Sequence, residues 1–75
     1  MSKRLPRLTA PEVVRALERA GFVLVRQTGS HRIYRNAEGR RVTVPVHPGK
    51  VLHPKLLWRI LKDAGLTVED VKEGR

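Results

Sequence analysis

The chain has 75 residues, too few for a second domain or for an enclosed cofactor cleft, so we predict one domain over residues 1–75, with its core at about 9–71, and no cofactor. It contains no cysteine, which excludes a disulfide framework and a thiolate metal site, and its 16 basic and 7 acidic residues give a net charge of +9. This charge indicates a polyanionic partner, with nucleic acid favoured over an acidic protein or an anionic membrane; plain solubility is the other explanation.

The first predicted element is a helix over about residues 10–20. Thr9 and Glu12 have the spacing of a capping box, in which each side chain bonds the backbone amide of the other residue. Apolar residues at helical spacing follow, and Gly21 is expected to end the helix in a left-handed conformation. Ahead of this helix, residues 1–6 lack the apolar stretch of a signal peptide, and no apolar run is long enough to span a membrane, so a cytoplasmic location is expected.

Three strands are predicted next, over about residues 22–27, 31–36 and 40–46. Short turns join them, Thr28-Gly29-Ser30 and then residues 37–39, and this spacing predicts an antiparallel meander. Gly29 is expected to supply a positive φ, and Ser30 a local backbone hydrogen bond or a phosphate contact.

Symmetric turns would set the register of this sheet. The second turn would place Tyr34 opposite Val42 and His31 opposite Pro45. The first would place Gln27 opposite His31 and Leu24 opposite Tyr34. Side chains alternate between the faces, so the helices are expected to cover the apolar set Phe22, Leu24, Tyr34, Val42, Val44 and Val46. The other face would carry His31 and His47 at one end, together with Val23, Val25, Gln27, Ile33, Arg35, Arg41 and Thr43.

After a loop at residues 48–50, Pro54 is predicted to begin a second helix that runs to about Ala64 and stops at Gly65. Residues 67–71 can form one further capped turn. The resulting order is α-β-β-β-α, an α+β fold with a three-stranded antiparallel sheet and two helices on one of its faces.

The turn before His31 lies in a strongly basic stretch, in which Glu38 is the only acidic residue between Arg19 and Arg59. RNA carries its own nucleophile, the 2′-hydroxyl, so its cleavage needs a base for that proton and positive charge for the transition state. His31 suits the role of base because imidazole titrates close to neutral pH. His47 is a candidate second acid or positioning residue, although a structural role in its loop is also open.

Roles are also predicted for other residues of this stretch. We predict that Arg26, Arg32, Lys50 and Lys55 bind phosphate, and that Tyr34 packs in the core. His53, just before Pro54, is expected at the surface or as a helix cap. No metal site is predicted, because magnesium sites need converging carboxylates and three histidines without cysteine or aspartate support make a weak zinc pattern.

Three segments in this order resemble the HicA family of toxins: Gly29-Ser30-His31-x-x-Tyr34, residues 42–50 (VTVPVHPGK) and residues 60–66 (ILKDAGL). The resemblance covers about Thr9 to Val71. It implies a fold like that of double-stranded-RNA-binding domains and the activity of an mRNA interferase, the endoribonuclease toxin of a type II toxin–antitoxin pair. It also implies that the catalytic histidine is His31 and that a HicB-like antitoxin covers the site.

One departure from the family pattern concerns the start of the second helix, where members usually carry Gly-Thr or Gly-Ser and this chain has Lys55-Leu56. A small residue followed by a hydroxyl leaves helix amides open to phosphate, and Lys55 would replace that contact with a point charge. The sequence therefore predicts a metal-independent endoribonuclease. The alternative is a non-catalytic RNA-binding module of the same fold, which more often binds duplex RNA by its shape.

Overall fold

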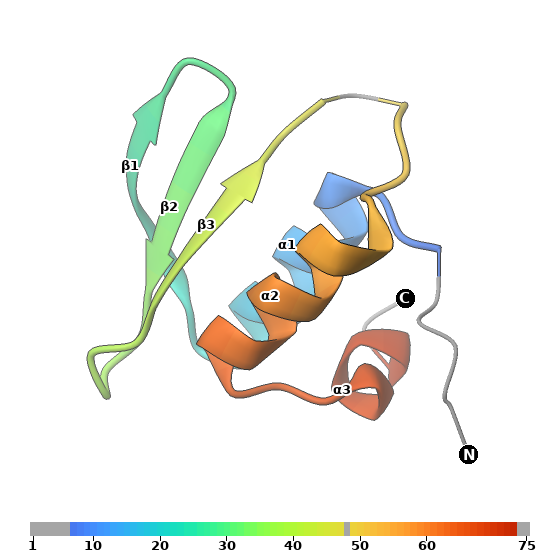
Figure 1. Ribbon diagram of the computed structural model, residues 1–75. Helices are drawn as coiled ribbons and strands as arrows, with labels where there is room; N and C mark the ends of the chain where they lie inside the picture. Colours follow the sequence, from blue (N-terminus) through green and yellow to red (C-terminus); the bar gives the residue numbers. More distant parts are fainter. Residues whose placement is uncertain (1–6, 48, 74–75) are drawn as a thin grey trace.

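The computed structural model describes residues 7–47 and 49–73, so Pro48 of the predicted loop lies outside the described residues. Along the chain the elements are α1 (Ala10–Arg19), β1 (Val23–Thr28), β2 (His31–Arg35), β3 (Arg41–Pro45), α2 (Pro54–Ala64) and α3 (Val68–Glu73). The strands form one antiparallel sheet in the order β1-β2-β3, and the helices lie to one side of it (Figure 1). The predicted α-β-β-β-α order and the fold class are confirmed, and α3 takes the place of the predicted capped turn.

Helix α1 begins and ends where its local chemistry requires. The Glu12 carboxylate accepts hydrogen bonds from the Thr9 backbone amide at 2.9 Å and from the Thr9 hydroxyl at 3.1 Å, so the predicted capping box forms. Gly21, with φ at +97°, then turns the chain toward β1. The positive φ is the conformation that favours glycine after a helix.

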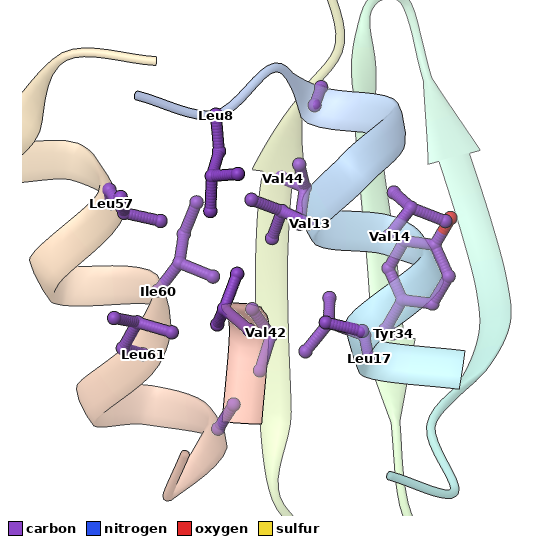
Figure 2. Close-up of a cluster of buried hydrophobic side chains, with 14 of the residues drawn as sticks. Leu8, Val13, Val14, Leu17, Tyr34, Val42, Val44, Leu57, Ile60 and Leu61 are labelled. Carbon is purple, nitrogen blue, oxygen red and sulfur yellow. The ribbon is translucent and has the colours of Figure 1, made fainter. Parts of the chain in front are cut away.

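The core lies between the two long helices and one face of the sheet. Figure 2 shows Val13 and Leu17 of α1 and Leu57 of α2 pointing toward the same interior, which Tyr34 and the valines of β3 close. Tyr34 is 1% exposed, which confirms that it packs in the core. Leu24, which was expected to be covered by the helices, is 46% exposed, so that expectation was wrong. No helix in the described part of the chain combines the length and the apolar character that crossing a bilayer requires.

The sheet register agrees with the prediction on the β3 side and at Leu24, which lies opposite Tyr34, and differs from it along β1 only beyond Val25. His31 lies opposite Pro45 and Tyr34 opposite Val42, as expected. Thr28, however, takes the place predicted for Gln27 opposite His31, because the turn is shorter than expected and the β1 register shifts between Leu24 and Arg26.

This register shift is a β-bulge at Val25, which inserts one extra residue and reverses the alternation of the side chains beyond it. Gln27 pairs with Arg32 and therefore shares the helix-covered face with it, whereas Arg26 pairs with Ile33 on the opposite face. The predicted face of Gln27 was thus wrong, and the bulge brings Arg26 onto the face that carries His31.

Helix α2 lies beside β3 and runs in the opposite direction (Figure 1). The His53 side chain caps the helix, since its Nδ1 accepts a hydrogen bond from the Lys55 amide at 3.1 Å. At the other end, the Arg40 guanidinium donates to the Asp63 carbonyl at 3.1 Å. The end of α2 is therefore tied to the turn that precedes β3.

Candidate active site

His31 is the first residue of β2 and lies on the face of the sheet opposite the core. Its neighbours across the strands are Thr28 and Pro45. Tyr34, three residues further along β2, is buried on the other face, which follows from the alternation of side chains along a strand. His31 is exposed, so its imidazole is accessible to a large substrate.

The His31 side chain lines a hollow of about 350 Å³ between β3 and α2, here called the β3–α2 hollow. From the sheet, Arg41, Thr43 and Pro45 line it together with His31. From α2 it is lined by Leu56, Arg59, Ile60 and Asp63, which follow one another at helical spacing. This volume is at the small end of the range for ligand sites and suits one nucleotide of a longer chain.

The charged groups of the β3–α2 hollow are distributed along its length. Because α2 runs opposite to β3, Leu56 lies toward the end of the sheet that carries His31 and Pro45, and Asp63 toward the end that carries Arg41. The Arg40–Asp63 hydrogen bond fixes this second end. His31 therefore has cations along the same hollow, while the one carboxylate among the lining residues lies at the far end.

The turn before His31 has the conformation that the motif predicts. Gly29 has φ at +56°, which confirms its expected role, and a side chain at this position would be strained. The Ser30 carbonyl accepts a hydrogen bond from the Val46 amide at 2.6 Å, which extends the contact between the turn and β3 by one residue. Gly29 and Ser30 thereby hold His31 at the end of β2.

His47 follows the end of β3, near the same end of the sheet as His31. Its side chain is exposed and is not among the residues that line the β3–α2 hollow. Its carbonyl accepts a hydrogen bond from the Lys50 amide at 3.2 Å, which closes a turn. The structural role of the His47 backbone is therefore clear, and a role of its imidazole in the reaction stays a prediction.

The four predicted phosphate-binding residues occupy different places. Arg26 lies on the face of His31, two rows further along the sheet, in the row of Ile33 and Thr43. Arg32 pairs with Val44 and lies on the helix-covered face; its Nε is buried and has no hydrogen-bond partner among the described residues.

Lys50 and Lys55 are both exposed, one in the loop after β3 and the other in the first turn of α2. Neither lines the β3–α2 hollow, but Leu56, the neighbour of Lys55, does. The departure from the family pattern at Lys55-Leu56 therefore falls at the edge of this hollow.

Sequence reasoning did not identify Arg41 and Arg59 as site residues, although both line the hollow of His31. Alternation along β3 places Arg41 on the face of His31, and that signal was present in the sequence. Arg59 gave no such signal, because its place depends on how α2 packs beside β3. Within residues 7–47 and 49–73, no three His, Cys, Asp or Glu side chains gather where they could hold a metal ion.

Comparison with known proteins gives one clear family match. The family described as the HicA toxin of bacterial toxin–antitoxin systems matches residues 10–66, which is well over half of the chain. The matched range begins with α1 and ends just after α2, so it includes the whole β3–α2 hollow. No curated protein matches the chain.

Proposed function

The chain belongs to the HicA family of bacterial toxins, and we propose that it exerts its toxic role as a metal-independent endoribonuclease that cleaves mRNA, with His31 as the general base. The observation that carries this proposal is the β3–α2 hollow, in which an exposed imidazole and two guanidinium groups, of Arg41 and Arg59, share one nucleotide-sized space. A toxin–antitoxin family implies a partner that restrains the toxin, and we propose a HicB-like antitoxin for that partner.

In the proposed reaction, His31 takes the proton of an RNA 2′-hydroxyl. The 2′-oxygen then forms a bond to the adjacent phosphorus, the bond from phosphorus to the 5′-oxygen breaks, and the products are a 2′,3′-cyclic phosphate and a 5′-hydroxyl end. The leaving 5′-oxygen takes up a proton, for which His47 and water are the candidate donors. General acid–base catalysis of this kind contributes about 10²–10⁴-fold to a rate.

Arg41 and Arg59 are suited to the charge that develops in this reaction. A phosphate under attack gains negative charge on its oxygens, and guanidinium groups close to it would stabilise that charge. Arg26, on the same face as His31, extends the positive surface toward β1 and is a candidate contact for the next phosphate. The hollow is open to solvent on the face of the sheet opposite the core, which suits a polymer that passes across the sheet.

The proposal is tested by replacing one histidine at a time with asparagine. His31→Asn is compared with His53→Asn, because the second variant undergoes the same change outside the hollow and asparagine preserves a helix cap. Each protein is incubated with a long mRNA in EDTA, and the ends formed are identified by mass spectrometry. We expect His53→Asn to cleave like the wild type and His31→Asn to be slower by about 10²-fold or more.

Undiminished cleavage by His31→Asn would overturn the assignment of the base. Cleavage that stops for every protein in EDTA and returns with magnesium would overturn metal independence. RNA binding without new ends, by all three proteins, would favour the non-catalytic RNA-binding module and direct attention to Lys55-Leu56.

A further inference from the structure

Strand β1 is an edge strand that exposes three consecutive apolar side chains. Val23 is 61% exposed, Leu24 46% and Val25 51%, and β1 pairs with β2 alone. Figure 1 shows β1 at the side of the sheet away from α2. An edge strand with uncovered apolar side chains is a template on which another chain can add a strand, because its outward backbone groups have no partner in the sheet.

The surface beside this edge is apolar and contains a hollow. Val23 and Val25 line a hollow of about 450 Å³ together with Arg35 and the turn residues Asn36 and Ala37. Arg35 lies opposite Val23 in the sheet, so a cation borders the apolar residues directly. Arg26 follows Val25 along the strand and is exposed. This surface, called here the β1 edge, therefore offers apolar contact with positive charge on both sides.

The charge decides which occupant fits. RNA finds few partners in a valine and leucine surface without aromatic rings, since single strands bind by base stacking as well as by charge. A second copy of this chain would bring two proteins of net charge +9 together at Arg26 and Arg35, which is unfavourable. An extended protein segment that carries apolar and acidic residues matches both features.

We infer that the β1 edge is the docking surface for an extended, acidic segment of the antitoxin, which adds a fourth strand to the sheet. This inference rests on the proposed toxin–antitoxin pairing. Strand addition takes its affinity from backbone hydrogen bonds and its specificity from alternate side chains. β1 is two strands from β3, about 10 Å, so the segment docks beside the β3–α2 hollow without using its residues.

The inference predicts that binding of the antitoxin can be weakened without loss of cleavage. Val25→Glu puts a negative charge on the β1 edge, and Val51→Glu makes the same change at a valine of matched exposure, 51% against 52%, outside the sheet. The proposed HicB-like antitoxin is titrated into each protein by calorimetry. We expect at least tenfold weaker binding for Val25→Glu, unchanged binding for Val51→Glu, and wild-type RNA cleavage by both free variants.

Amide hydrogen exchange tests the strand addition itself. Those amides of Val23–Thr28 that point away from β2 should exchange more slowly in the complex than in the free toxin. Val25→Thr keeps the branched shape of the side chain and adds no charge. It should therefore bind the antitoxin more weakly than the wild type and more tightly than Val25→Glu.

Equal binding by Val25→Glu and Val51→Glu, or unchanged exchange in β1, would overturn the inference while the nuclease proposal stands. Weaker RNA binding by Val25→Glu, with unchanged antitoxin binding, would assign the β1 edge to RNA instead. An antitoxin that binds none of the proteins, the wild type included, would overturn both the proposed pairing and this inference. The nuclease proposal would not be affected, because the comparison of the wild type with His31→Asn tests it separately.

Discussion

At the scale of single residues, the candidate site combines His31 with cations from two different elements that line the same hollow. Arg41 belongs to β3 and Arg59 to α2, and each lines the β3–α2 hollow. Their guanidinium groups suit a phosphate because a planar guanidinium can donate two parallel hydrogen bonds to its oxygens. Arg32, by contrast, lies on the other face of the sheet, so being next to His31 in the sequence does not place a cation in its hollow.

We predict that Arg59→Ala weakens RNA binding and that Arg15→Ala does not. Arg15 is an exposed residue of α1, away from the β3–α2 hollow, and makes a matched control. A charged hydrogen bond contributes about 1.5–3 kcal/mol, so the loss of Arg59 should raise the RNA dissociation constant by roughly 10- to 100-fold. Each lost phosphate contact should also lower the salt slope of binding to single-stranded RNA by about 0.7.

The measurement is the RNA dissociation constant of the wild type and both variants at several salt concentrations. An unchanged slope for Arg59→Ala, with weaker binding at every salt concentration, would show that Arg59 acts through the packing of α2 and not on a phosphate. Equal losses for Arg59→Ala and Arg15→Ala would show that only the total charge matters.

At the scale of elements, the sequence predicts each helix and strand well because their signals are local. Capping residues, turn glycines and alternation mark the ends of α1, α2 and the strands, and the β2–β3 register follows from a symmetric turn. The bulge at Val25 was not predictable in this way, since nothing in the run Val23-Leu24-Val25 distinguishes a regular strand from a bulged one. The position of Arg59 in the site was not predicted for a related reason, since it depends on packing between elements.

The start of the short helix α3 is stabilised by one ionised side chain, that of Asp70. The Asp70 carboxylate accepts hydrogen bonds from the Thr67 backbone amide at 2.8 Å and from the Thr67 hydroxyl at 3.0 Å. These bonds, the backbone one first, hold the pKa of Asp70 below its ordinary value of 3.8. A lowered pKa means that the charged form is favoured in the fold, so its stabilising effect is present above the unfolded pKa and is lost as the pH falls through the folded pKa.

We therefore predict that Asp70→Asn lowers the melting temperature near pH 6, and that the gap from the wild type closes as the pH falls below about 3.8. Glu69→Gln removes a carboxylate from the same turn of α3 without touching the bonds to Thr67, so its melting temperature should follow the wild type. Thermal unfolding followed by circular dichroism between pH 2 and pH 6 measures both. A gap for Asp70→Asn that stays constant across this range would show that its cause is not the ionised cap.

At the scale of the whole molecule, the net charge of +9 acts on the fold and on its ligands in opposite directions. Like charges on a protein this small repel one another and destabilise the compact state, while they attract RNA and acidic proteins. The molecule measures 36 × 27 × 19 Å. The Debye length is about 30 Å at 0.01 M salt and about 8 Å at 0.15 M, so the repulsion spans the molecule at low salt and becomes local at physiological salt.

Raising NaCl from 0.01 to 0.15 M should accordingly raise the melting temperature of the free protein and weaken its RNA binding over the same range. Arg15→Glu lowers the net charge by two, from +9 to +7, at an exposed position outside the β3–α2 hollow, and should reduce the salt-induced gain in melting temperature. Thermal unfolding and RNA titration in the same buffers measure the two effects side by side. A melting temperature that falls with added salt would mean that local attractions between charges outweigh the net repulsion. The net charge would then not destabilise the fold, and the view that the protein loses stability in order to bind polyanions would be wrong.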